Sequence, residues 1–107
     1  MVEDLGIVGI SWRQINSEAL SRFTLPASSL EKKLTVFAKK TGLSELAYLE
    51  TCNRVEIIYS KNPEIPHHDI RPLVYELLTN EQAKLGEAER SLKAWRGEGA
   101  CEHLFLV

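Results

Sequence analysis

Apolar residues recur along this chain with two different periods, and together they predict a mixed α+β domain. Four short apolar runs rich in β-branched residues predict strands at residues 5–12, 45–51, 55–60 and 92–95. Leucine, valine and phenylalanine at helical spacing predict helices over residues 28–41 and 69–79. A last helix is expected to open after Gly97.

Residues that favour helix ends mark both of the longer predicted helices. Ser28 and Glu31 have the spacing of a capping box, and Gly42 stands where a glycine commonly ends a helix. In the second helix Asp69 is the expected N-cap, and Pro72 falls in the first turn, where its missing N–H is tolerated. These signals indicate two separate helices joined to the strands by loops.

The order of the predicted elements is strand, helix, strand, strand, helix, strand, which is typical of a ferredoxin-like split βαβ sandwich. We expect an α+β fold with an antiparallel sheet and both helices on one face. Residues 1–107 make up one domain of ordinary size. Because the last residues, HLFLV, are apolar and lack a helix-ending signal, we expect the domain to be a fragment of a longer protein.

Composition and charge narrow the function classes. Hydrophobic residues make up 44% of the chain and charged residues 26%, which is enough apolar material for a folded core. A net charge of −2 gives no overall basic surface for nucleic acid. No apolar run reaches the roughly 18–20 residues of a membrane span, and two cysteines do not form a disulfide scaffold. We therefore expect a cytoplasmic protein that does not bind membranes.

The segment with the clearest chemistry is the short connection between the second and third predicted strands. It contains Cys52, whose thiolate is a nucleophile, and Arg54, whose charge favours that thiolate and whose planar guanidinium binds carboxylates. The residues alone leave two interpretations open. Cys52 is a reactive nucleophile, or it is a turn cysteine beside a surface ion pair of Arg54 with Glu56 or Glu50.

A second candidate is His103 on the predicted last helix. It would transfer a proton or orient a substrate, or it would simply pack half-buried against the sheet. Cys101, two residues away, points to a different helix face. We expect no metal site, since neither a C-x-x-C nor an H-E-x-x-H spacing occurs, and no cofactor site, since no G-x-G-x-x-G or Walker loop occurs. Trp12 and Trp95 are expected to be core or rim aromatics.

Three segments resemble one known family. Residues 51–60, TCNRVEIIYS, resemble the S-T-C-N-R-x-E-x-Y segment of glutamyl-tRNA reductases. Residues 5–10 are similar to that family's opening strand, and residues 100–107, ACEHLFLV, to its A-x-x-H-L-x-x-V helix. The chain departs from the family pattern at Trp12, where histidine is common, at residues 20–22, where an Arg-Glu pair is common, and at Glu50, where serine is common.

The resemblance implies an oxidoreductase that begins the five-carbon route to tetrapyrroles such as porphyrins and haem. By this match Cys52 attacks the ester that joins glutamate to tRNA and forms a glutamyl thioester, which NADPH reduces to glutamate-1-semialdehyde. Thr51, Asn53 and Arg54 would line the glutamyl site, with Arg54 binding the glutamate carboxylate. His103 would lie near the sulfur and assist proton transfer or orientation.

The resemblance also implies partners beyond this domain. Glutamyl-tRNA is the substrate, NADPH binds to a following domain, and a helical domain after that forms a homodimer, so both of these domains lie outside residues 1–107. An aminotransferase would take up the semialdehyde. Two alternatives stay open: a divergent, non-catalytic ferredoxin-like binding or regulatory module, and a redox-sensing domain that uses Cys52 and Cys101.

Overall fold

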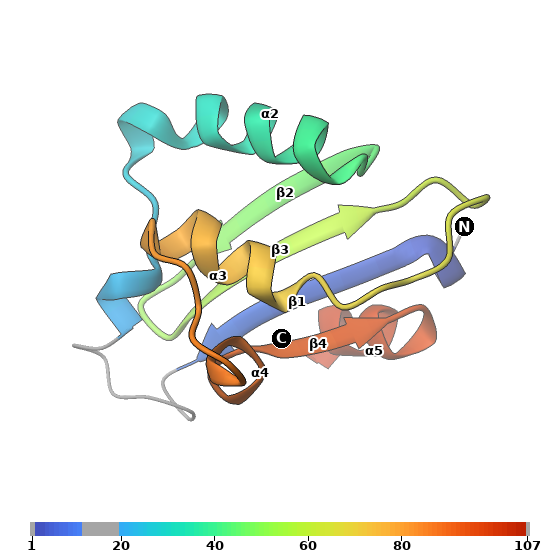
Figure 1. Ribbon diagram of the computed structural model, residues 1–107. Coiled ribbons are helices and arrows are strands. Elements are labelled where there is room, and N and C mark those ends of the chain that lie inside the picture. The colour runs from blue at the N-terminus through green and yellow to red at the C-terminus, as the bar shows by residue number, and fades with distance from the viewer. Residues whose placement is uncertain (1, 12–19, 107) are drawn as a thin grey trace.

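The computed structural model describes residues 2–11 and 20–106, and its centre is a four-stranded sheet (Figure 1). The strands are β1 (Leu5–Ser11), β2 (Glu45–Glu50), β3 (Arg54–Ser60) and β4 (Lys93–Arg96). They lie in the order β2-β3-β1-β4, and each neighbouring pair is antiparallel. The α+β, ferredoxin-like architecture expected from the sequence is therefore confirmed. Trp12, at the end of the first predicted strand, lies outside the described residues.

Helices of different lengths connect and follow the strands. They are α2 (Leu30–Thr41), α3 (Arg71–Thr79), α4 (Glu87–Ser91) and α5 (Glu98–Leu106). The first two agree with the predicted helices to within two residues at the start and match them at the end. The last one agrees with the helix expected after Gly97.

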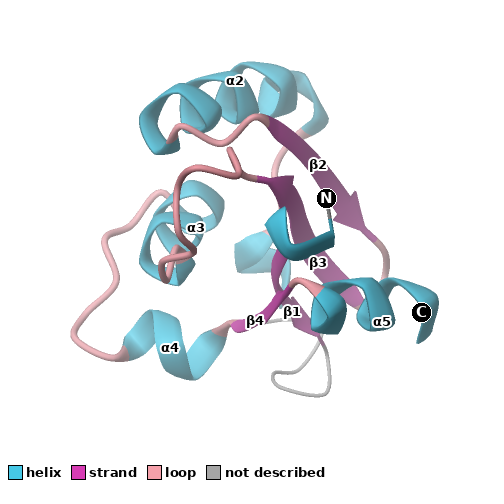
Figure 2. Ribbon diagram, turned by 90° about the vertical axis from the view of Figure 1, so that its right-hand side faces the viewer, coloured by secondary structure: helices cyan, strands magenta, loops and turns pink. Residues whose placement is uncertain are grey.

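The hydrophobic core lies between the sheet and the pair α2 and α3, which pack on one face as expected (Figures 1 and 2). Successive strand residues point to opposite faces, so alternate residues of β1 and β3 reach this core. The strands contribute Val8, Ile10, Val55, Ile57 and Tyr59, and the two helices contribute Phe37, Val74, Tyr75 and Leu78. Burial of each large apolar side chain contributes about 1.5–3 kcal/mol, so this layer fixes the strand register.

The C-terminal end of α2 agrees with the sequence signals, and its N-terminal end does not. Gly42 has φ 74° in the left-handed region and ends the helix, as predicted. The predicted capping box is wrong, because the N-cap is Ser29 and no side chain caps the helix there. A 3₁₀ turn, Ala27–Ser29, precedes the helix and holds Ser28 inside the turn, away from the N-cap position.

Asp69 lies one residue before the N-cap of α3, although the sequence predicted it at the N-cap itself. The N-cap residue is Ile70, which has no side-chain cap, so the assignment of Asp69 to that position is wrong. Asp69 nevertheless accepts hydrogen bonds from the backbone N–H of Arg71 at 3.0 Å and from its Nε at 2.9 Å. Pro72 lies in the first turn, as predicted.

α5 lies on the face of the sheet opposite α2 and α3, so the sheet is covered from both sides (Figure 2). The reversal after β4 occurs at Gly97, which has φ 56° and donates its N–H to the carbonyl of Leu5 at 2.8 Å. This second face carries the other set of β3 side chains, Arg54, Glu56 and Ile58. The candidate site is built on it.

Candidate functional site

Cys52 lies at the tip of the tight turn between β2 and β3. The backbone N–H of Thr51 donates to the carbonyl of Arg54 at 2.9 Å, which closes the turn. The Thr51 hydroxyl oxygen accepts the N–H groups of Asn53 at 3.1 Å and Arg54 at 3.2 Å. Cys52 is exposed, and its thiol donates to the Asn53 side-chain oxygen at 3.7 Å. The turn thus presents a solvent-accessible thiol, whereas Cys101 on α5 is half-buried.

A tyrosine on β2 fixes the strand that leads into this turn. The Tyr48 hydroxyl accepts the backbone N–H of Leu25 at 2.9 Å and donates to the carboxylate of Glu50 at 2.7 Å. Burial, aided by the Glu50 carboxylate, raises the pKa of Tyr48 to about 12, so the hydroxyl keeps its proton. Glu50 pairs in register with core-facing Val55 and therefore lies on the opposite face of the sheet from Arg54.

Arg54 and Glu56 lie two residues apart on β3 and point to the same face. The Arg54 Nε is 3.7 Å from the Glu56 Oε1, and the side chains are 22% and 3% exposed. Within the described part of the chain, both of these atoms are buried without a hydrogen-bond partner. The pair is therefore not the surface ion pair that the sequence left open, because its carboxylate is removed from water.

His103 on α5 contacts the second oxygen of the same carboxylate. Its Nε2 donates a hydrogen bond to the Glu56 Oε2, and its side chain is 17% exposed. The imidazole also stacks on the indole of Trp95, with ring centroids 3.8 Å apart and planes 17° from parallel. A hydrogen bond and a stacked ring together fix both the position and the plane of the imidazole.

Gly9 on β1 makes room for the Glu56 side chain. It is the direct partner of Glu56 in the antiparallel register. A Cβ atom at Gly9 would come within 2.6 Å of the Glu56 Cγ and 2.7 Å of the Val55 carbonyl oxygen. Only glycine fits there without displacing the carboxylate or the backbone of β3, so this residue is part of the site although it carries no functional group.

The fold brings some of the sequence-predicted residues together and leaves others apart. Arg54 and His103 meet at one carboxylate, and Trp95 forms the wall behind the imidazole. Thr51, Cys52 and Asn53 contact one another in the turn. The sequence indicated Glu56 only as a surface partner of Arg54 and Trp95 only as a core or rim aromatic, and nothing in it pointed to Gly9. A usable signal for Glu56 was its position as the one charged residue in an otherwise apolar strand, VEIIY.

Among the residues that the structure describes there is neither a metal-binding cluster nor a membrane-spanning helix. No group of three or more histidine, cysteine, aspartate or glutamate residues there is arranged to hold a metal ion. In the same part of the chain, no helix is both long and apolar enough to cross a membrane.

Residues 8–107 match the family described as the glutamyl-tRNAGlu reductase N-terminal domain. The chain belongs to this family. It is 33% identical, over its whole length, to a glutamyl-tRNA reductase of Oleidesulfovibrio alaskensis and covers 23% of that protein. It is 28% identical over 96% of its length to a glutamyl-tRNA reductase of Synechococcus sp. WH7803, again covering 23% of the relative.

A solved structure has the same fold as this domain. Glutamyl-tRNA reductase from Methanopyrus kandleri superposes with a TM-score of 0.67 at 25% identity. The match covers 98% of this chain and 22% of the other. The chain thus spans slightly less than a quarter of the length of the relatives that it matches.

Proposed function

We propose that this domain binds the glutamyl end of glutamyl-tRNA and forms a glutamyl thioester on Cys52, as the first stage of a glutamyl-tRNA reductase. The observation that carries the proposal is the exposed thiol at the tip of a turn followed, two residues later, by a largely buried arginine. A thiol that meets a large substrate must be accessible, and a guanidinium that binds a carboxylate gains strength from partial burial.

The proposed step is a transfer of the glutamyl group from oxygen to sulfur. The Cys52 thiolate attacks the ester carbonyl, the sulfur–carbon bond forms, and the ester carbon–oxygen bond breaks. The thiol proton passes to the ribose hydroxyl of the departing tRNA, so no oxidant or reductant takes part. Asn53 places its side-chain oxygen beside the sulfur, and Thr51 holds the turn through the backbone N–H of Asn53.

Arg54 is the proposed partner of the glutamate side chain. Its guanidinium forms a fork that matches the two oxygens of a carboxylate. The Nε approaches Glu56 at 3.7 Å, which is longer than a hydrogen bond, so Glu56 orients the arginine without forming a hydrogen bond to it. Glu56 is thus a positioning residue for the substrate-binding arginine.

His103 is the proposed proton-transfer group. The Glu56 carboxylate accepts a hydrogen bond from the Nε2–H of His103, which leaves Nδ1 as the ring atom available to a substrate. Glu56 therefore selects the tautomer of the imidazole, in the manner in which a buried carboxylate orients a catalytic histidine. The stacked indole of Trp95 holds the ring plane.

The described residues do not fit NADPH. The sequence has no glycine-rich phosphate loop, and neighbouring strands of the sheet are all antiparallel, so no two adjacent parallel strands form a dinucleotide-binding crevice. We therefore assign no reduction step to this chain, and we propose that NADPH binds to a separate domain. We also propose that the full protein is a homodimer and that an aminotransferase receives its semialdehyde product. A cytoplasmic location would keep Cys52 reduced.

The experiment measures free glutamate released from glutamyl-tRNA, because water would slowly hydrolyse a thioester formed on Cys52. Release of glutamine from glutaminyl-tRNA is measured for comparison, since its side chain lacks the carboxylate. We expect Cys52→Ser to abolish the release and Cys101→Ser to leave it unchanged. Arg54→Lys keeps the charge but loses the fork, so the preference for glutamyl-tRNA should fall roughly ten- to a hundredfold. An unchanged preference in Arg54→Lys would contradict the assignment of Arg54.

A further inference from the structure

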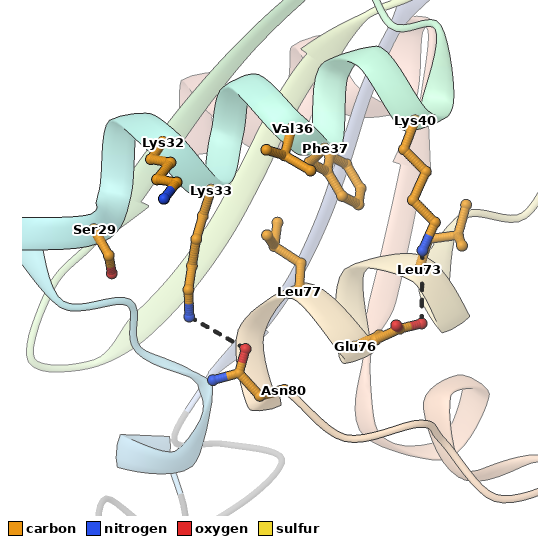
Figure 3. A pocket seen from close by; sticks show the side chains of 10 residues that line it. All are labelled: Ser29, Lys32, Lys33, Val36, Phe37, Lys40, Leu73, Glu76, Leu77 and Asn80. Carbon is orange, nitrogen blue, oxygen red and sulfur yellow. Dashed lines mark hydrogen bonds and ion pairs between the residues drawn. The ribbon is translucent and has the colours of Figure 1, made fainter.

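A groove runs between α2 and α3, on the side of the domain opposite α5 (Figures 2 and 3). It has a volume of about 490 Å³, which is large enough for several side chains of a bound partner. Ten residues line it: Ser29, Lys32, Lys33, Val36, Phe37, Lys40, Leu73, Glu76, Leu77 and Asn80. None of them belongs to the site around Cys52, so the groove is a separate surface.

The floor of the groove is aliphatic. Val36 on α2 is 58% exposed, so its side chain is open to a bound partner. Leu73 and Leu77 on α3 are half-buried and also line the groove. Leu77 points toward Val36, and Leu73 lies near the end of the Lys40 side chain (Figure 3). Phe37 is 4% exposed, so no aromatic ring is open for stacking.

The rim of the groove is basic, although the chain as a whole is acidic. It carries three lysines and one glutamate, whereas the rest of the chain has ten basic and fourteen acidic residues. Lys33 donates to the Asn80 side-chain oxygen at 3.2 Å, and Lys40 lies 3.8 Å from Glu76 (Figure 3). Both side chains of the Lys40–Glu76 pair are about half exposed, and such pairs contribute little. The lysines can therefore exchange these partners for stronger anionic ones.

We propose that this groove binds an acidic amphipathic helix of a partner protein. Apolar side chains at i, i+3, i+4 and i+7 would lie on Val36, Leu73 and Leu77, and flanking carboxylates would pair with the lysines. Lys33 and Lys40 are seven residues apart, or about two helical turns, so the occupant carries acidic residues at both ends of its apolar stripe. This inference does not depend on the chemistry proposed for Cys52.

The floor and walls favour a helix over other occupants. α2 and α3 satisfy their own backbone groups, so an extended segment laid between them would find no hydrogen-bond partners for its main chain. A helix satisfies its main chain internally. Single-stranded nucleic acid would need exposed aromatic rings on which its bases stack, and the ring of Phe37 is buried.

The test uses a fluorescein-labelled, helix-forming peptide of about twelve residues, with leucine at i, i+3, i+4 and i+7 and glutamate on both flanks. Its binding to the 107-residue chain is followed by fluorescence anisotropy. We expect saturable binding that weakens with salt, and much weaker binding of a peptide with lysine in place of glutamate. The double variant Lys32→Glu/Lys33→Glu should bind at least about tenfold more weakly.

Matched variants separate the groove from general charge. Lys33→Glu alone should also weaken binding. Lys39→Glu makes the same charge change as Lys33→Glu on the same helix but outside the groove, and it should bind within about twofold of the parent. Val36→Glu, at an exposed position, should fold normally and lose binding. The proposal is overturned if Lys39→Glu and Lys33→Glu weaken binding equally, or if both peptides bind alike. It is also overturned if poly(U) displaces the acidic peptide, because the groove would then be a nucleic-acid surface.

Discussion

The carboxylate of Glu56 holds the imidazole of His103 across 47 residues of chain. The contact joins the middle of β3 to α5 on the face of the sheet that α2 and α3 leave uncovered. The same carboxylate lies 3.7 Å from Arg54, so two candidate functional side chains depend on one buried anion. The site is therefore a consequence of the position of α5 as much as of the turn at Cys52.

The first prediction concerns the space that Gly9 provides. Gly9→Ala places a Cβ within 2.7 Å of the Val55 backbone oxygen, so we expect a loss of about 1–3 kcal/mol in the free energy of unfolding. Gly99→Ala on α5 meets nothing within 4 Å and should gain up to about 1 kcal/mol from helix propensity. Urea denaturation of the two variants measures both effects. Equal stability of Gly9→Ala and the parent would contradict the close approach of β1 to Glu56.

The second prediction concerns the coupling of Glu56 with His103. A double-mutant cycle of Glu56→Gln and His103→Ala should give an interaction energy of about 0.5–3 kcal/mol in the free energy of unfolding, because the two side chains share a buried hydrogen bond. The control cycle combines Glu56→Gln with Cys101→Ala, on the same helix, and should be additive. Additivity in both cycles would mean that the contact contributes nothing to the fold.

The third prediction concerns the two thiols. Iodoacetamide should modify Cys52 faster than Cys101 in the folded chain, because Cys52 is exposed at the turn and Cys101 is half-buried on α5. Mass spectrometry of the two cysteine peptides gives both rates. In urea the two rates should converge. Faster modification of Cys101 in the folded chain would count against an accessible Cys52.

The fourth prediction concerns stability in acid. The hydrogen bond from Lys61, at 2.8 Å, is the main cause that lowers the pKa of Asp4. The Asp4 side chain is 5% exposed and the Lys61 side chain is 10% exposed. A carboxyl with a lowered pKa in the folded state stabilises the protein above its ordinary pKa of 3.8, and this stability is lost as the pH falls below it. Asp4→Asn should therefore flatten the decline in melting temperature between about pH 5 and pH 2.

A second acidic residue provides the control for this measurement. The pKa of Asp69 is also lowered, mainly by the hydrogen bond from Arg71, but the Asp69 side chain is 38% exposed. Solvent screens such a pair, so Asp69→Asn should flatten the acid decline less than Asp4→Asn does. The reverse order would show that burial of the Asp4–Lys61 pair does not govern the acid response.

Much of the fold followed from the sequence because local signals and the tertiary structure agree. The apolar, β-branched run of β3, the apolar stripe of α3 and the helix-ending Gly42 each predict a feature that the structure contains. The capping box failed because Ser28 entered a 3₁₀ turn, an alternative that the same residue types favour.

The site was only partly predictable, and Glu56 shows why. A charged residue between two core-facing strand residues normally points to water, since one face of an antiparallel sheet is commonly solvated. Here α5 covers that face, and no local signal in β3 reports a helix that begins about forty residues later. Cys52 and His103 were candidates from their residue types and positions, and the resemblance gave them specific roles, whereas the buried carboxylate between Arg54 and His103 required the tertiary structure.

Formation of a glutamyl thioester on Cys52 is measured by the mass of the Cys52 peptide after incubation with glutamyl-tRNA. The 107-residue chain is mixed with glutamyl-tRNA, quenched in acid and digested, and both cysteine peptides are weighed. We expect one glutamyl group on Cys52, which hydroxylamine removes as it removes a thioester, and none on Cys101. An unmodified Cys52 at saturating glutamyl-tRNA, or a glutamyl group that persists in Cys52→Ser, would contradict this expectation.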